Sequence, residues 1–313
     1  MNCSKKVTNK EASKFFKYYY SFFIFNSVSI LVIILCFVII LYYKVGPYHK
    51  LYAYQINKLN KNQSNIDTIF IGDSSLGQAI NADLFNTISG LKSINLALTG
   101  LYGLAGSYNM IKKATKLNQV KNVILMQTLD LISRPVAYDG YLYSMENFDD
   151  FVELTFNEKI LLIKTSINIL FSFTNLKRII HFFPVQERLK YTIENDYMKQ
   201  VTIKDRKKKY KNIRIHINKD KIIFLHKIVS YCNQHRINLI YIHGPHLNNI
   251  NNQSRQDIQD VNAIIKSTGV NFINKSYFFS PQQMGDSLDH IYPDFKDQIT
   301  EEYFNYIKND LVY

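Results

Sequence analysis

Cysteine is scarce in this chain. The 313 residues include only Cys3, Cys36 and Cys232, and these are not spaced as metal ligands. Three cysteines in a chain of this length do not make a disulfide framework. Cys36 falls within a long uncharged segment and Cys3 precedes that segment, so Cys232 is expected to be a lone thiol in the core. The sequence therefore predicts no disulfide framework, no metal site and no cofactor.

Acidic residues are also few: 25 Asp and Glu stand against 38 Lys and Arg, which gives a net charge of +13. Such a surface is expected to meet an anionic partner, which is phospholipid, an acidic polymer or nucleic acid. Residues 204–211 form a basic run, but no nucleic-acid-binding signature accompanies it. A solvated loop near anionic lipid or polymer is favoured over nucleic-acid binding. No internal repeat is present.

Charge is absent from residues 22–43, a strongly apolar segment with tyrosines at both ends. At 1.5 Å per residue its length is about 33 Å, enough to cross a hydrocarbon core of roughly 30 Å. The run is too long for the apolar part of a signal peptide, and no small-residue cleavage site follows it. We expect a cytoplasmic tail at residues 1–21 and one transmembrane helix at residues 22–43. Flanking lysines nearly balance, so the positive-inside rule hardly decides the orientation.

Beyond the apolar segment, residues 44–65 are expected to form a partly helical stalk, and an α/β domain is expected from residue 66 to residue 313. Apolar runs predict strands at residues 66–71, 91–98, 120–126, 237–242 and 270–273. Helical patterns lie between and after them, at residues 104–117, 222–235, 256–267 and 295–308. This alternation predicts a mostly parallel sheet covered by helices on both faces.

Residues 135–220 do not fit that alternation and are interpreted as a helical insertion. Residues 138–143 are aromatic and loop-like, whereas residues 151–170 and 173–183 have the composition of apolar helices. Loops at this edge of a sheet often form the functional site, so the insertion is either a lid or substrate wall, or a purely structural subdomain.

The first predicted strand ends in Gly72-Asp73-Ser74, and a polar, helix-compatible segment follows. Gly72 permits a tight turn, which would present Ser74 at the carboxyl end of the strand, where ligands of open α/β sheets bind. Free backbone N–H groups at the start of the next helix stabilise negative charge there. The alternative is that Asp73 or Ser74 simply caps this helix.

A second polar cluster, Gly285-Asp286-Ser287-Leu288-Asp289-His290, precedes the last predicted helix. The Gly-Asp-Ser block and this late His, in this order, resemble the SGNH (GDSL-type) hydrolase and acyltransferase superfamily over residues 66–313. The resemblance implies a flavodoxin-like three-layer sandwich in which Ser74 is the nucleophile and His290 the base.

The superfamily carries an Asp three residues before its His, and this chain has Ser287 there. Asp286 is therefore the favoured residue to orient His290, with Asp289 as its rival. If neither reaches the imidazole, a slower Ser–His dyad remains.

The resemblance also implies oxyanion donors, namely the Ser74 backbone N–H and Gly100 after the second strand, with Gly103 as an alternative. The superfamily's third block supplies an Asn after the third strand, and this chain has none there. Gln127 or Thr128 is expected to donate instead. His243 and His246 follow the fourth strand and are candidate substrate contacts.

These features predict a membrane-anchored serine esterase or O-acyltransferase. Its expected substrate is an acyl ester, most simply acetyl, of a cell-envelope polysaccharide or another acylated glycan. Its expected place is the cytoplasmic (inner) membrane, with the C-terminal domain on the extracytoplasmic side. Lipid and a membrane-bound acyltransferase are further expected partners, and nucleic acid is not. The alternative is an inactive SGNH-fold protein that binds envelope polymer or that acyltransferase.

Overall fold

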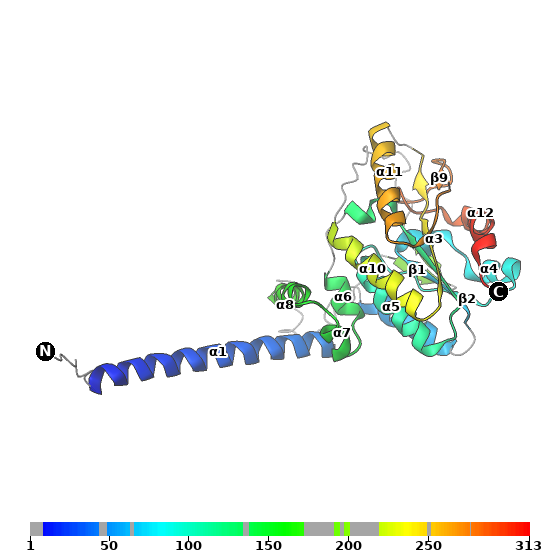
Figure 1. The fold of residues 1–313 in the computed structure, drawn as a ribbon. Helices are drawn as coiled ribbons and strands as arrows, with labels where there is room; N and C mark the ends of the chain where they lie inside the picture. The colour runs from blue at the N-terminus through cyan, green and yellow to red at the C-terminus, as the bar shows by residue number, and fades with distance from the viewer. Residues whose placement is uncertain are drawn as a thin grey trace. The chain divides into compact units, whose positions relative to one another are not determined.

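The computed structural model of the protein divides the chain into two compact units (Figure 1). One unit comprises Met1–Gly46 and Leu154–Phe183, and the other comprises Pro47–Glu153 and Pro184–Tyr313. The structure describes residues 9–43, 49–62, 66–133, 138–171, 191–194, 197–200, 219–248, 252–275 and 277–313.

The second unit is built on a five-stranded sheet in which every pairing is parallel. Its strand order is β2-β1-β3-β6-β8. The strands are β1 (Thr68–Gly72), β2 (Ser93–Asn95), β3 (Asn122–Gln127), β6 (Asn238–His243) and β8 (Asn271–Ile273). Counted along the chain this is the order 2-1-3-4-5, in which the strand order reverses between the first and third strands. The α/β class with a mostly parallel sheet is therefore confirmed.

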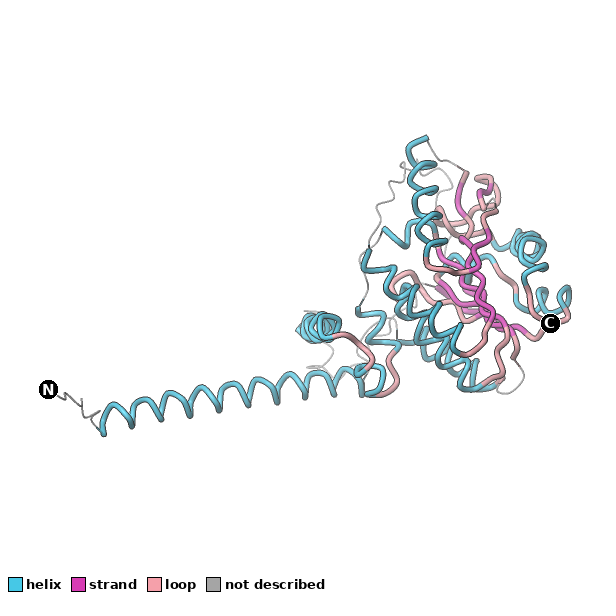
Figure 2. The backbone as a smooth tube through the Cα atoms, in the orientation of Figure 1, coloured by secondary structure: helices cyan, strands magenta, loops and turns pink. Residues whose placement is uncertain are grey.

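Helices cover both faces of this sheet, with the strands between them (Figures 1 and 2). One face carries α5 (Gly103–Leu117), α10 (Lys219–Gln234) and α11 (Asn252–Ser267). The other carries α3 (Ser74–Ala79), α4 (Ala82–Ser89) and α12 (Lys296–Ile307). Because both faces are covered, all five residues of β1 are buried, which explains its uninterrupted apolar run.

Helix α2 (His49–Lys61) belongs to this unit, contrary to the expectation of a stalk at residues 44–65. Leu59 is fully buried, and Gln55 Nε2 donates a hydrogen bond of 2.7 Å to the carbonyl oxygen of Ala97. That carbonyl lies just beyond β2, the edge strand of the sheet. The domain therefore begins before residue 66, because α2 contributes apolar side chains to the core and donates hydrogen bonds to carbonyl oxygens at and just after the end of β2.

The insertion at residues 135–220 contains helices and a small hairpin. Its helices are α6 (Tyr138–Ser144), α7 (Phe148–Val152) and α8 (Phe156–Phe171), and its hairpin pairs β4 (Tyr191–Glu194) with β5 (Tyr197–Gln200). Strand β5 packs beside α3, the helix that follows β1. The helix expected at residues 173–183 and the basic run at residues 204–211 lie outside the described residues.

Two expectations for the insertion were wrong. Residues 138–143 form α6 rather than a loop, and the single helix expected at residues 151–170 is broken after α7. The break has a local cause, because Thr155 N donates to Glu158 Oε2 (2.7 Å) and Glu158 N donates to Thr155 Oγ1 (3.4 Å). This reciprocal capping box starts a new helix, α8, and its Thr-x-x-Glu pattern was present in the sequence.

The first unit contains α1 (Asn9–Tyr43), a continuous helix of 35 residues, and α8, which packs against it. Over the described residues, none of the helices combines the length and the apolar character that a membrane crossing requires. The transmembrane helix expected at residues 22–43 is therefore not supported by the structure. The side chains of residues 32–43, which include much of that apolar run, lie outside those that are described.

Gly72 marks the closest approach between β1 and β3. A Cβ atom added there would lie 1.8 Å from the carbonyl oxygen of Met126. Because the obstacle is backbone in a central strand, we expect Gly72→Ala to lower the free energy of unfolding by about 3 kcal/mol. Urea unfolding of the full chain measures this change.

Gly90 supplies the control, because its left-handed φ of 74° strains alanine but nothing lies within 4 Å of an added Cβ. Gly90→Ala is expected to cost only about 1 kcal/mol. Equal losses in the two variants would contradict the steric explanation.

Candidate active site

The turn after β1 is held by the carboxylate of Asp73, which is buried and caps α3. Asp73 Oδ1 accepts hydrogen bonds from Ser75 N (2.9 Å) and Ser75 Oγ (2.5 Å). Asp73 Oδ2 accepts one from Thr128 N (2.9 Å), at the end of β3. The carboxylate therefore joins the ends of β1 and β3 where the strand order reverses. Asp73 does cap the helix, and Ser74 occupies its first position.

The segment before α12 is folded into a compact loop, here called the His290 loop (residues 284–291). An isolated β-bridge joins Met284 and Ile291 at its ends, and Gly285 N donates to the carbonyl oxygen of His290 (2.7 Å). A further bond of 2.8 Å runs from Leu247 N to the carbonyl oxygen of Leu288. Leu247 belongs to the short strand β7 (His246–Leu247), which pairs with β9 (Phe278–Phe279) and was not predicted.

This loop brings the expected serine, histidine and aspartate together. His290 Nε2 lies 2.9 Å from Ser74 Oγ, although the residues are 216 positions apart. His290 Nδ1 lies 2.8 Å from Asp286 Oδ1. With the proton on Nδ1, the imidazole donates to Asp286 and accepts the Ser74 hydroxyl proton, which is the arrangement of a Ser–His–Asp triad.

The two candidate aspartates lie near different nitrogens of the His290 ring. Asp286 reaches Nδ1 from four residues away because the His290 loop is turned rather than extended. Asp289 lies on the other side of the ring, with Oδ1 3.8 Å from Nε2. Ser287, which stands at the superfamily's Asp position, donates through Oγ to Asp289 and so supports the rival carboxylate.

Two of the donor groups expected after β3, the Gln127 amide and the Thr128 backbone N–H, bind other groups, and no hydrogen bond engages the Thr128 hydroxyl among the described residues. Gln127 Nε2 donates to Ser107 Oγ of α5 (3.0 Å), and the N–H of Thr128 is used by Asp73. The Gln127 amide and the Thr128 N–H are therefore not aimed at an oxyanion in this arrangement, and the Thr128 hydroxyl stays a candidate. Gly100 is better placed, because Leu98 N donates to the carbonyl oxygen of Gly72 (2.9 Å) and so extends the β1–β2 pairing toward the Ser74 turn. Gly103 begins α5.

Thr99 is a further candidate for the site, and sequence reasoning did not single it out. It directly follows Leu98, whose N–H donates to the carbonyl oxygen of Gly72, two residues before Ser74. Its Oγ1 is buried and has no hydrogen-bond partner among the described residues. Buried hydroxyls in proteins are usually hydrogen-bonded, so an unpaired one after β2, the strand beside β1, is a candidate donor to a bound substrate. In the sequence, the only signal for Thr99 was its position after the second predicted strand.

The two histidines after β6 have different surroundings. His243 is fully buried, its Nε2 lies 2.8 Å from Asn262 Oδ1, and burial lowers its pKa to about 4. It is therefore not a direct substrate contact, contrary to expectation. His246 is also buried, and burial lowers its pKa, although a backbone hydrogen bond and the charges of Asp289 and Asp130 oppose that shift.

His290 lies in a strongly negative environment. Burial disfavours its charged form, but the charge of Asp289 and the hydrogen bond and charge of Asp286 outweigh burial, and the pKa of His290 is raised. The pKa of Asp73 is raised as well, but here the shift favours the neutral form. Burial, followed by the charge of Asp289, raises the pKa of that carboxyl, and the hydrogen bonds from Ser75 and Thr128 oppose the shift.

Lys296 connects α12 to the far end of α3. Its Nζ donates to the carbonyl oxygen of Gly77 (2.7 Å), and burial, with a smaller effect of Lys58, lowers its pKa to about 7. Both the neutral and the charged amine can donate this hydrogen bond. Lys296 thereby helps to hold α3, and with it Ser74, against α12.

Within the described part of the chain, no group of three or more His, Cys, Asp or Glu side chains is arranged to hold a metal ion. Cys232, in α10, is buried, and burial raises the pKa of its thiol to about 12. It is therefore a core residue rather than a reactive thiol.

The position of Asp289 leads to a test that does not require activity. We expect Asp289→Asn to lower the pKa of His290, because it removes the largest charge contribution that raises this pKa. NMR titration of the His290 ring in the full chain measures the shift. Asp294→Asn, an exposed neutralisation four residues further on, is the control and should leave the pKa in place.

The same charges make stability depend on pH. Because the folded state raises the pKa of His290 above 6.5, its contribution to stability is complete below pH 6.5 and is lost as the pH rises through the raised value. Asp289→Asn should reduce this dependence. A pKa of His290 that is unchanged in Asp289→Asn would contradict the assigned electrostatics.

Comparisons of this chain with models of protein families, with curated proteins and with solved structures find no match. Its function is therefore inferred from the geometry around Ser74, His290 and Asp286.

Proposed function

We propose that the protein is an SGNH-like serine esterase or O-acyltransferase. The observation that carries the proposal is the chain of contacts from Ser74 Oγ to His290 Nε2 and from His290 Nδ1 to Asp286. These three residues have the types, the order and the mutual distances that acyl transfer requires. The sheet order 2-1-3-4-5, with Ser74 after β1 at the switch point, agrees with the flavodoxin-like arrangement that the resemblance implies.

In the proposed reaction, Ser74 Oγ attacks the carbonyl carbon of an ester while His290 Nε2 takes the hydroxyl proton. Asp286 keeps the other ring proton on Nδ1 and stabilises the imidazolium that forms. Backbone N–H groups at the start of α3 and near Gly100 would stabilise the oxyanion. His290 then gives the proton to the departing alcohol, which leaves an acyl-serine.

The second half of the reaction repeats these steps with a new nucleophile. His290 deprotonates water or a sugar hydroxyl, which attacks the acyl-serine and releases Ser74. Water gives an esterase and a sugar hydroxyl gives a transferase. Ser74 and His290 are 8% and 3% exposed, and such a dry environment favours transfer to a bound acceptor over hydrolysis by bulk water.

The cellular setting is proposed from the sequence. The uncharged residues 22–43 support an anchor in the cytoplasmic membrane, and the net charge of +13 supports an anionic partner such as an envelope polysaccharide. Acetyl is the simplest acyl group. A binding protein without activity is the second candidate, because the chain has no Asn after β3 and the Gln127 amide there is bound to Ser107.

The first test uses the full chain in a mild detergent, treated with a serine-directed fluorophosphonate and with p-nitrophenyl acetate. We expect labelling at Ser74 and ester turnover. Both should be lost in Ser74→Ala and reduced by at least about 10³-fold in His290→Ala, since the hydroxyl loses its base. Ser267→Ala, at the exposed end of α11, is the control and should behave as the wild type. A folded wild-type chain that shows neither labelling nor turnover would favour the binding protein.

Thr99 provides a second test of the same site. If its hydroxyl donates to the oxyanion, Thr99→Val should lower kcat by about 10²-fold and leave KM nearly unchanged, because the interaction exists only in the transition state. Thr99→Ser keeps the hydroxyl and should recover most of the rate. A Thr99→Val enzyme with wild-type kcat would exclude this role.

A further inference from the structure

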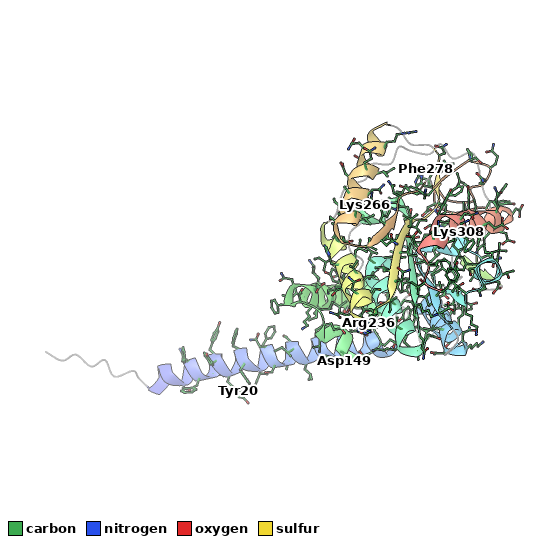
Figure 3. All side chains as sticks on the ribbon, turned by 45° about the vertical axis from the view of Figure 1, so that its right-hand side comes forward. Tyr20, Asp149, Arg236, Lys266, Phe278 and Lys308 are labelled. Atoms are coloured by element: carbon green, nitrogen blue, oxygen red, sulfur yellow. The ribbon has the colours of Figure 1, made fainter. Side chains whose placement is uncertain are left out.

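A separate cavity of about 360 Å³ lies at the carboxyl ends of β6 and β8. Here it is called the α11 cavity, because one face of that helix forms its wall. The residues that matter for its chemistry are Arg255, Gln259, Asn262, Lys275, Tyr277 and Phe278. Phe278 is labelled in Figure 3, which also shows the side chains around it.

The lining combines positive charges, side-chain amides and aromatic rings. Such a lining suits an anionic ligand that has both a polar and an apolar face. Arg255 and Lys275 are both exposed and supply two positive charges, and the lining residues that the structure describes include no carboxylate. The acidic residues of α11, Asp257 and Asp260, do not line the cavity. Side-chain amides and aromatic rings complete the wall. Cations suit a carboxylate or phosphate, amides suit hydroxyl groups, and aromatic faces suit the C–H surface of a sugar ring.

The floor of the cavity is fixed before any ligand arrives. Asn262 Nδ2 donates to Asn274 Oδ1 (3.2 Å), and Asn262 Oδ1 lies 2.8 Å from His243 Nε2. Tyr303 Oη donates to the carbonyl oxygen of His243 (3.0 Å), so this network is anchored to the end of β6 and to α12. Fully buried His243 therefore supports the cavity rather than contacting substrate. A floor held in this way loses little conformational entropy on binding.

The cavity and Ser74 lie along one edge of the sheet. Strand β8 is three positions from β1, and at about 4.8 Å per strand the separation is roughly 14 Å. Strand β7 joins the two regions, since Leu247 is bonded to the His290 loop and the next residue, Asn248, lines the cavity. A monosaccharide does not cover such a distance, whereas a polymer held in the cavity could present another of its units to Ser74.

We infer that the α11 cavity binds an anionic unit of the glycan substrate, a sugar that carries a carboxylate or a phosphodiester. The inference rests on the proposed function for its glycan and deepens it, because it names the charge of the substrate. Arg255 and Lys275 bind the negative group, Gln259 contacts hydroxyl groups, and Phe278 packs against the ring.

The test measures binding to the full chain in a mild detergent by isothermal titration calorimetry. The probes are oligogalacturonate for the carboxylate source, a glycerol-phosphate oligomer for the phosphodiester source, and dextran of similar length as the neutral control. We expect at least one anionic probe to bind about tenfold or more tightly than dextran, with an affinity that falls as salt rises. The probe that binds identifies the source of the charge.

Variants test whether the probes bind in the α11 cavity. Arg255→Gln and Lys275→Gln should each weaken the anionic probe about tenfold, as expected for one charge-assisted contact. Lys92→Gln removes the same charge from an exposed residue before β2, at the opposite end of the strands, and should change binding less than twofold. Ser74→Ala should bind like the wild type, because the cavity does not include Ser74.

Two results would overturn the inference: equal affinity for the anionic probes and dextran, or equal losses in Lys92→Gln and the two cavity variants. Fluorophosphonate labelling separates this outcome from failure of the proposed chemistry, since it depends only on the Ser74 site. Labelling with no preference for anionic probes rejects the cavity alone. Cavity-dependent binding without labelling rejects the chemistry and leaves the cavity as an anionic-glycan site.

Discussion

The candidate site depends on one buried carboxylate. Asp73 accepts hydrogen bonds from two N–H groups and one hydroxyl, and these donors come from both the start of α3 and the end of β3. Hydrogen bonds to a charged group contribute about 1.5–3 kcal/mol each, so the three together are of the same order as the several kcal/mol that burial of a charge costs. The arrangement is thus sustainable only while all three donors stay in place. This requirement fixes the turn and leaves the hydroxyl of Ser74 directed toward His290.

Close backbone packing at two glycines also holds the turn around Asp73 in place. Gly72 lets β1 approach β3, and a Cβ on Gly244 would lie 2.2 Å from Ser75 Oγ, the hydroxyl that bonds to Asp73. Glycine at both positions therefore lets the ends of β1, β3 and β6 converge around a single carboxylate. A larger side chain at either position would displace Ser75 or the strand ends, and the geometry of Ser74 would change with them.

The sequence was sufficient for the central sheet and for the residues at the end of β1, because an apolar run followed by Gly-Asp-Ser is a local signal. It favoured Asp286 to orient His290 but left Asp289 open as a rival. That choice depends on the bridge between Met284 and Ile291, a pairing of short segments that no propensity reveals. The assignment of α2 to a stalk failed because the burial of Leu59 arises from tertiary packing. Gln127 was misjudged as a donor for a similar reason, since its partner Ser107 comes from α5.

The charge of Asp289 has two opposing effects on the proposed reaction. Its carboxylate favours the imidazolium form of His290, which helps His290 to accept the proton of Ser74. The same charge, 3.8 Å from Nε2, disfavours a negative oxyanion nearby. The second effect is limited if the oxyanion forms on the side of Ser74 that faces Gly100 and Thr99, with His290 between the two charges. In that arrangement the imidazolium lies between two negative groups and stabilises both. The acidic His290 loop is thus compatible with the proposal that the oxyanion donors lie on the β2 side of Ser74.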